Sequence, residues 1–149
     1  MRPLLVSLLL LVVLAFTPLA ASAQARSQST DVSAAEAKAV RKVIEAQLDA
    51  FRHDDAKRAF SYAAAGIRDM FGSAESFLEM VRTSYAVVYR PRNVVFEPPE
   101  RVGADVVQPV IMTDAEGRGW IALYPMRREK DGTWRINGCS LGRLGGQEV

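Results

Sequence analysis

The sequence predicts an α+β fold in which about three N-terminal helices pack on a curved antiparallel sheet of four to five strands. Between residues 33 and 85, apolar residues recur at three- and four-residue steps, as on the buried face of a helix. From residue 86 onward, short runs of valine, isoleucine and aromatic residues alternate with turn residues, as in successive strands. The chain has 149 residues, a length that suits one folded domain with one core.

Residues 1–23 have the pattern of a secretory signal peptide. Arg2 precedes an apolar run over residues 4–16, which ends at Pro18 and a series of small residues. Ala21-Ser22-Ala23 fits a cleavage site, and a cut after Ala25 is the alternative. An uncleaved anchor is the competing interpretation, but the run breaks before the roughly 20 residues that span a bilayer. We therefore expect a periplasmic or secreted protein with no membrane insertion after cleavage.

Cys139 is the only cysteine, so the chain cannot form an internal disulfide and has no lipoprotein cysteine at the cleavage site. It lies in a strand-like stretch, where a buried thiol behaves as a small apolar side chain. The alternative is a nucleophilic or redox role, which requires an exposed thiolate in an electropositive environment. We favour packing.

The charge balance argues against a polyanionic partner. The chain carries 19 basic and 17 acidic residues, and removal of Arg2 with the leader changes the formal net charge from +2 to about +1. Basic residues occur in local pairs flanked by acids rather than on one face, so nucleic acid is not expected to bind. The glycines near the C-terminus lack the Gly-Lys-Ser/Thr ending of a phosphate-binding loop, and no cofactor is expected.

The first predicted helix begins at a capping box. In Ser33-x-x-Glu36, the serine oxygen can accept from a free amide while the glutamate reaches back to the serine backbone. The apolar stripe of this helix comprises Val40, Val43, Ile44, Leu48 and Phe51. His53-Asp54-Asp55 interrupts the pattern, and an aspartate there can cap a second, short helix over residues 56–64.

A further helical turn is predicted over residues 67–71, ended by Gly72. Ser73 then caps a third helix, whose common face carries Phe77, Leu78, Val81 and Tyr85. The helical half is expected to end near Tyr85.

The expected strands cover residues 87–90, 94–96 with an extension toward Val102, 106–113, 119–127 and 133–140. Glycines in the intervening segments supply turns. Trp120, Ala122, Tyr124 and Met126 share one side of their strand, and Ile121 and Leu123 share the other, so both faces are largely apolar and one of them is expected to face the helices. Pro109 and Pro125 interrupt two strands and cannot donate ladder hydrogen bonds, so we expect edge strands or bulges there.

These patterns predict four segments. Residues 1–23 form the signal peptide, 24–32 a polar arm, 33–144 a single α+β domain, and 145–149 a flexible tail.

The chain resembles a bacterial family of secreted proteins known as domain of unknown function 4864. The residues that carry the resemblance are Ile44-x-x-Gln47-x-x-Ala50-Phe51, Asp54-Asp55, Ala59-Phe60, Ile67-x-x-Met70-Phe71-Gly72, Phe77-x-x-Met80-Val81, Tyr85, Tyr89-Arg90-Pro91, Gln108, Tyr124-x-Met126 and Gly132-x-Trp134-Arg135-Ile136-Asn137-Gly138. They span nearly all of the predicted domain. The resemblance implies a shape and no established activity.

The order of three helices followed by a curved sheet also resembles the cone-shaped fold of the nuclear transport factor 2-like superfamily. That superfamily includes isomerases, dehydratases, cyclases and modules that only bind or dimerise, so the fold does not choose the function. The catalytic aspartate and tyrosine of the isomerases belong to motifs that this chain does not match, and none is transferred.

Aromatic and amide side chains supply the candidate ligand-binding residues, which are Tyr85, Tyr89, Gln108, Trp120 and Tyr124. Ligand pockets combine apolar walls with a few polar groups, which here would be Gln108 and the tyrosine hydroxyls. The competing interpretation is that these aromatic residues, with Trp134, fill the core.

No catalytic residue or metal ligand can be assigned from the sequence. His53 is the only histidine, and no metal-binding spacing accompanies it. A catalytic role for His53 with Asp54 or Asp55 is the alternative to helix capping, but adjacent helix residues do not face one another.

Three functions remain compatible with the sequence. We favour a non-catalytic binding domain for a small apolar or amphipathic ligand or a protein partner. The first alternative is a small enzyme that transfers a proton on a hydrophobic substrate, and a cavity containing a buried Asp or Glu would favour it. The second alternative is a module that forms a homodimer through an exposed sheet face.

Overall fold

The computed structural model describes residues 31–145. The predicted signal peptide, residues 24–30 of the predicted arm and residues 146–149 of the predicted tail lie outside the described residues.

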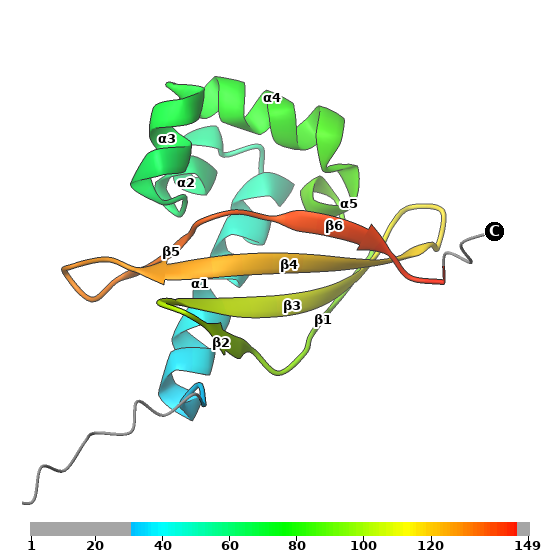
Figure 1. The fold of residues 1–149 in the computed structure, drawn as a ribbon. Coiled ribbons are helices and arrows are strands. Elements are labelled where there is room, and N and C mark those ends of the chain that lie inside the picture. Colours follow the sequence, from blue (N-terminus) through cyan, green and yellow to red (C-terminus); the bar gives the residue numbers. More distant parts are fainter. Residues whose placement is uncertain (1–30, 146–149) are drawn as a thin grey trace, which may run out of the picture.

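Within residues 31–145, five helices precede six strands (Figure 1). The helices are α1 (Ala34–Arg52), α2 (Ala56–Ser61), α3 (Ala65–Phe71), α4 (Ala74–Ser84) and α5 (Ala86–Tyr89). The strands are β1 (Asn93–Phe96), β2 (Glu100–Val102), β3 (Asp105–Thr113), β4 (Gly119–Arg128), β5 (Trp134–Ile136) and β6 (Ser140–Arg143). The predicted α+β class is confirmed, with N-terminal helices packed on a strongly curled antiparallel sheet.

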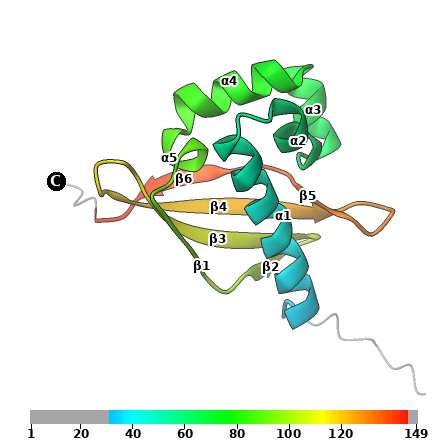
Figure 2. The ribbon, with the colours of Figure 1, turned by 180° about the vertical axis from the view of Figure 1, so that it is seen from behind.

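The predicted capping box at the start of α1 is confirmed. The Ser33 hydroxyl accepts a hydrogen bond from the Glu36 amide at 3.3 Å, and the Glu36 carboxylate accepts from the Ser33 amide at 3.1 Å. Arg101 of β2 also donates to Glu36 at 2.9 Å, which links the first turn of α1 to the sheet. Figure 2 shows α1 crossing one face of the sheet.

The ends of the shorter helices follow from local sequence. Asp55 accepts from the Arg58 amide at 3.0 Å to cap α2, and Ser73 accepts from the Ser76 amide at 3.1 Å to cap α4. Gly72 ends α3 in the left-handed conformation, with φ of 69°, a region in which most side chains are strained.

The predicted strand over residues 87–90 is wrong, because this segment forms the short helix α5. Val87 and Val88 are both buried, which adjacent residues of a strand with one buried face cannot be. The Val88 amide donates to the Tyr85 carbonyl at 2.9 Å, closing a helical turn. Burial of both valines in the core therefore overrides their preference for strands.

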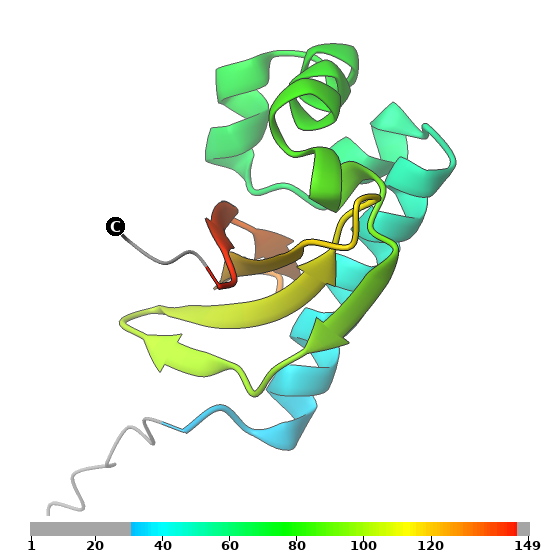
Figure 3. The same ribbon diagram turned by 90° about the vertical axis from the view of Figure 1, so that its right-hand side faces the viewer.

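Two long strands, β3 and β4, form the centre of the sheet, and each is flanked by two short strands. β1 and β2 pair with successive parts of β3, while β6 and β5 pair with successive parts of β4. All of these pairings are antiparallel, and Figure 3 shows the resulting curl of the sheet.

Pro109 and Pro125 lie opposite the breaks between the short flanking strands. The Pro109 carbonyl accepts from the Glu97 amide at 3.1 Å, at the point where β1 has ended and β2 has not begun. The Pro125 carbonyl accepts from the Asn137 amide at 2.7 Å, between β5 and β6. β3 and β4 are therefore interior strands of the sheet and not the predicted edge strands. Each proline lies where the neighbouring short strand is interrupted, so no backbone N–H is needed from the proline to pair with that strand.

The predicted strand over residues 133–140 is divided in two. Backbone pairing with β4 stops after Ile136 and resumes at Ser140, where Ser140 lies opposite Leu123. The same edge also contacts the helical layer, since the Ile136 amide donates to the Tyr62 carbonyl at 2.8 Å. The last predicted strand is thus β5, a bend at residues 137–139, and β6.

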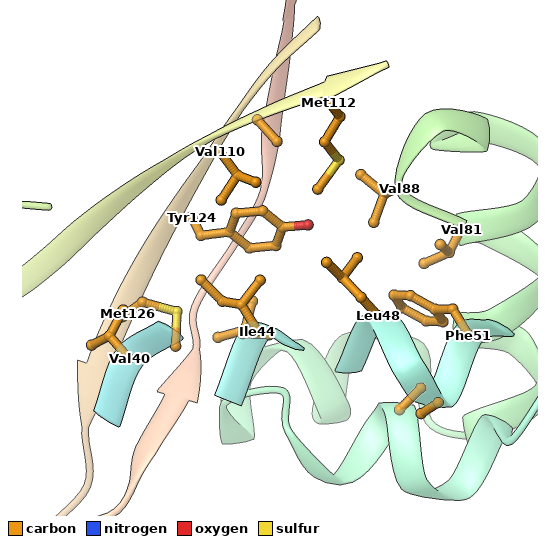
Figure 4. Close-up of a cluster of buried hydrophobic side chains, with 14 of the residues drawn as sticks. Val40, Ile44, Leu48, Phe51, Val81, Val88, Val110, Met112, Tyr124 and Met126 are labelled. Atoms are coloured by element: carbon orange, nitrogen blue, oxygen red, sulfur yellow. The ribbon is translucent and has the colours of Figure 1, made fainter. Parts of the chain in front are cut away.

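The core lies between α1 and one face of the sheet, here called the inner face (Figure 4). On β4 the predicted alternation is confirmed, since Ala122, Tyr124 and Met126 are buried and Leu123 is exposed. Tyr124 packs between the buried residues of α1 and Val110 of β3.

Candidate functional site

An apolar cavity of about 310 Å³ lies between the helices and the β5–β6 edge of the sheet. Its wall combines residues of α1, α3 and α4 with Val88 of α5, Tyr124 of β4, and the bend at residues 137–139. The volume is at the lower end of the range of small-molecule sites, roughly 300–1,000 Å³.

Phenylalanine rings form much of the helical wall. Phe77 of α4 is the centre of this group, with ring centroids 6.1 Å from Phe51 and 5.6 Å from Phe71, the latter edge-on. Phe60 contacts Phe77 from outside the cavity wall at 5.4 Å. Such tilted and edge-on contacts favour defined positions of the aromatic rings in this wall.

Two methionines lie on the helices that border the cavity. Met70 of α3 is 76% exposed although it contributes to the wall, and Met80 of α4 is half-buried. Methionine is flexible and polarisable, and such side chains adapt to ligands of different shape. The α3–α4 side is therefore the adaptable part of the cavity.

Tyr124 and Gln47 are buried residues of the wall that carry polar groups. The Tyr124 side chain is 1% exposed, and its hydroxyl points from the sheet toward Val88 and Leu48 (Figure 4). This hydroxyl has no hydrogen-bond partner among the residues that the structure describes. Burial raises the pKa of Tyr124 well above its ordinary value, so the hydroxyl keeps its proton at physiological pH.

Tyr85 and Cys139 close the other side of the wall. The Tyr85 hydroxyl donates to the Cys139 carbonyl at 3.2 Å and so links the end of α4 to the bend between β5 and β6. The Cys139 thiol lies beside the Tyr124 hydroxyl, and each group affects the pKa of the other. Burial raises the pKa of Cys139 to about 12, so its reactive thiolate form is scarce.

The cavity wall contains no Asp, Glu, Lys, Arg or His among the described residues. Asp114 is the buried carboxylate among the described residues, and it lies outside this wall, in the turn between β3 and β4, where it lines a separate hollow beside α5. Asp114 accepts from the Trp120 indole at 2.9 Å, the Arg118 guanidinium at 2.7 Å and two backbone amides. The carboxylate oxygens of Asp114 thus accept the hydrogen bonds that stabilise the turn.

A family model matches this chain over most of its length. Residues 33–149 match the family described as domain of unknown function (DUF4864). The chain belongs to this family. Neither a curated protein nor a solved structure matches it.

In this DUF4864 domain, the five predicted ligand-binding residues do not converge on one site. Tyr85 and Tyr124 line the apolar cavity. Tyr89 and Trp120 line a separate hollow of about 460 Å³ beside α5. Gln108 is buried on β3, where its amide donates to the Glu97 carbonyl at 2.6 Å and to the Pro109 carbonyl at 2.8 Å. These two hydrogen bonds provide donors for backbone carbonyls at the break between β1 and β2, so the Gln108 amide has a structural role there.

Two motifs of the DUF4864 resemblance meet at the end of α1. Asp54 has a left-handed backbone with φ of 53°, and its carboxylate accepts from the Tyr89 hydroxyl and from Arg90 at 3.2 Å. Arg90 also donates to the Phe51 carbonyl and stacks on the Tyr89 ring, 4.1 Å from its centroid. This network joins α1 to α5, and the hydrogen bond from Tyr89 lowers the pKa of Asp54.

His53 and its neighbours form no metal site among residues 31–145, where no group of three or more potential His, Cys, Asp or Glu ligands occurs. The His53 ring contacts the Asp49 carbonyl at 2.8 Å at the exposed end of α1. In the same part of the chain, no helix combines the length and apolar character needed to cross a bilayer.

Most residues of the cavity wall belong to apolar stripes that the sequence predicts as hydrophobic core. Phe51, Phe77 and Val81 are predicted to pack on apolar stripes, and they do so while also lining the cavity. Met70 and Met80 are not among the predicted site residues. The signal that could have found them is in the DUF4864 motifs, because Ile67-x-x-Met70-Phe71 and Phe77-x-x-Met80-Val81 place both methionines beside the phenylalanines of the wall.

Proposed function

We propose that this DUF4864 domain is a non-catalytic binding domain that holds a small apolar or amphipathic ligand in the cavity beside α3 and α4. The observation that carries the proposal is a cavity of about 310 Å³ whose wall is mainly apolar and includes a few polar side chains, among them Gln47, Tyr124 and Asn137. Binding sites for small molecules commonly have this composition.

The cavity favours binding over proton transfer. A general acid or base must lie within hydrogen-bond reach of the proton that it transfers. Tyr124 is in the wall, but burial moves its pKa further from neutrality, and no carboxylate or imidazole accompanies it among the described wall residues. We therefore rank the enzyme hypothesis second.

Fluorescence of N-phenyl-1-naphthylamine, a neutral dye that brightens in apolar sites, tests the proposal. We expect saturable binding to the wild-type protein and its loss in Ile67→Trp, which places a larger side chain in the wall. The matched control is Asp69→Trp, on an exposed position of the same helix, which should bind as the wild type does. Equal binding by both variants would place the dye elsewhere, and no saturable binding to the wild type would contradict the proposal.

A second candidate function, homodimer formation, is favoured by the outer face of the sheet. The register places Val95, Ile111 and Ile121 in one row across three strands, and Leu123 lies near this row. Val95 is 45% and Leu123 37% exposed. A contiguous apolar sheet face is the type of surface that a second copy can cover, and a specific interface buries roughly 1,000 Å² or more in total.

Light scattering over a dilution series tests this second candidate. A dimer mass for the wild type that falls to the monomer mass in Leu123→Lys would support it. The control is Lys130→Glu, at the exposed β4–β5 turn, which should leave the mass unchanged. A monomer at every concentration of wild-type protein would contradict it.

We further propose that the fold is the cone of the nuclear transport factor 2-like superfamily, since the curled antiparallel sheet and the long helix across its inner face are consistent with it.

We also propose that this is a bacterial protein that acts in the periplasm or outside the cell. The basis is the leader pattern of residues 1–23. Intact-mass measurement of the exported protein should give a chain that begins at Gln24 or Arg26, and a retained Met1 would contradict export by cleavage.

A further inference from the structure

We propose that Met70 is a reversible oxidation site at the mouth of the cavity, and that its conversion to methionine sulfoxide weakens the binding of apolar ligands. The oxidant that we infer is a peroxide, and the reductant is a thiol-dependent methionine sulfoxide reductase. The effect on binding rests on the proposed function, whereas the oxidation itself does not.

The sulfur-containing residues of the described chain differ in their access to solvent. Met70 is 76% exposed, Met80 is half-buried, and Met112 and Met126 are fully buried. A peroxide has to contact the sulfur that it oxidises, so exposure selects Met70. Cys139 competes poorly, because burial raises its pKa to about 12 and its nucleophilic thiolate is scarce.

Met70 belongs to the cavity wall although most of its surface faces solvent. A wall residue that is also this exposed lies at the mouth of the cavity. Its neighbours on α3, Ile67 and Phe71, line the same wall and are less exposed. An apolar ligand in the mouth therefore contacts the Met70 side chain.

The fold does not depend on the Met70 side chain. None of the seven residues of α3 is buried, and Ile67 and Phe71 are the residues of this helix that pack against the core cluster. Met112 and Met126 belong to that cluster. Oxidation at Met70 should thus alter the cavity and leave the domain folded, whereas oxidation of either core methionine would disturb the packing.

The chemistry at Met70 is a two-electron oxygen transfer. The thioether sulfur donates a lone pair to one oxygen of hydrogen peroxide, and the O–O bond breaks. The other oxygen takes the proton of the transferred hydroxyl and leaves as water, so the sulfur is oxidised and the peroxide is reduced. In the reverse direction, two thiols of the reductase system form a disulfide while the sulfoxide oxygen leaves as water.

The sulfoxide opposes binding because its S–O group is polar. An apolar ligand that covers this group removes it from water and supplies no hydrogen bond in return. The cost falls on the complex alone, since the exposed side chain stays hydrated in the unliganded protein. The affinity for an apolar ligand should therefore fall on oxidation and recover on reduction.

Hydrogen peroxide treatment, followed by peptide mass spectrometry and dye titration, tests the inference. We expect one added oxygen at Met70 while Met112 and Met126 stay unmodified. After removal of the peroxide, the dissociation constant of N-phenyl-1-naphthylamine should be about five- to tenfold higher, and methionine sulfoxide reductase with a dithiol should restore it. Absence of oxygen at Met70, or equally fast oxidation of Met112 and Met126, would overturn the inference.

Met70→Leu is the matched variant, because leucine has a similar volume and no sulfur to oxidise. It should bind the dye as the wild type does and keep its affinity after peroxide. The control Met80→Leu retains Met70 and should lose affinity as the wild type does. Equal losses in Met70→Leu and the wild type would place the sensitive residue elsewhere and overturn the inference.

The outcomes separate this inference from the proposed function. If the untreated wild type does not bind the dye, the binding function fails and the effect of oxidation on it fails too. If the untreated protein binds and oxidation of Met70 leaves the dissociation constant unchanged, the role of Met70 is overturned while the binding function stands. A loss of affinity accompanied by a lower urea midpoint would also overturn the inference, since it would show damage to the fold.

Discussion

At the scale of single residues, Asp54 and Asp55 are neighbours with different structural roles. Asp55 caps α2 through the Arg58 amide. Asp54 adopts a left-handed backbone and joins α1 to α5 through Tyr89 and Arg90. Neither side chain lies in the apolar cavity, so structure accounts for both positions without a catalytic role.

The Asp55 cap gives a prediction about stability. Asp55→Ala should lower the free energy of unfolding by about 1 kcal/mol, because the Arg58 amide loses its acceptor, whereas Asp55→Asn retains a capping oxygen and should cost little. Urea unfolding of the three proteins measures the difference. A loss of stability in Asp55→Asn equal to that in Asp55→Ala would show that the negative charge, rather than the cap, is important.

The buried carboxylate of Asp114 gives a prediction about pH. Burial alone would raise its pKa, but hydrogen bonds from Trp120 and Arg118 outweigh burial and hold the pKa well below its usual range. A group whose pKa is lower in the folded state contributes stability above its unfolded pKa of about 4, and this contribution is lost as the pH falls toward the folded value. Stability should therefore decrease on acidification below about pH 4.

Comparison with Asp114→Asn isolates this contribution. The urea midpoint of the wild type should exceed that of Asp114→Asn at pH 6, and the gap should narrow at pH 3. The control Asp69→Asn changes an exposed carboxylate on α3 and should show no such narrowing. If the difference between the two urea midpoints is the same at pH 6 and at pH 3, the ionised form of Asp114 does not stabilise the folded state.

At the scale of elements, α3 and its C-cap contain two glycines that should respond in opposite directions to the same substitution. Gly66 lies within the helix, where an added Cβ would meet no atom within 4 Å. Gly66→Ala should therefore raise the free energy of unfolding by about 0.5–1 kcal/mol. Gly72 has φ of 69° at the C-cap, and Gly72→Ala should lower it by about 1 kcal/mol.

Chemical unfolding of both variants tests this pair, and Gly72→Asn is the control because asparagine tolerates left-handed backbone better than alanine. The asparagine variant should fall between the wild type and Gly72→Ala. If Gly66→Ala destabilises the protein, α3 does not hold the helical conformation at that residue.

The elements differ in how far the sequence predicts them. Helix starts at Ser33 and Ser73 and the stop at Gly72 depend on contacts within a few residues, and the sequence predicts all three. The helix at Val87 and Val88 and the break near Gly138 depend on packing and pairing with distant segments. Local pattern could not reveal them, since tertiary contacts decide strand structure.

The cavity shows the same division between local and distant contacts. Tyr85 and Tyr124 are candidates from the sequence because tyrosine combines an apolar ring with a polar group, and both lie in the wall. Gln108 has the same general character, yet its amide is used by backbone carbonyls of the strand break. Which polar group is left without a partner depends on three-dimensional contacts, and the sequence does not show it.

At the scale of the whole molecule, broken flanking strands and the cavity have a common origin. The edge of β4 carries two short strands instead of one long strand, and the bend between them at residues 137–139 forms part of the wall. Tyr62–Ala64 pairs with Ile136 of β5, which fixes the helical layer over this edge. The cavity is thus part of the architecture that connects helices to sheet, and its occupation should affect the stability of the entire domain.

Thermodynamic linkage turns this coupling into a prediction. A ligand that binds only the folded state adds RT ln(1 + [L]/Kd) to the free energy of unfolding, about 2.7 kcal/mol at a ligand concentration 100-fold above Kd. We therefore expect N-phenyl-1-naphthylamine at that excess to raise the urea midpoint of the wild type, and to leave unchanged the urea midpoint of Ile67→Trp, in which the larger side chain narrows the cavity. Hydrogen exchange should slow in α1, α4 and β4 together, because their residues share the wall and the core. Protection confined to α3 would instead show that the ligand binds a locally mobile surface and that the cavity is not coupled to global unfolding.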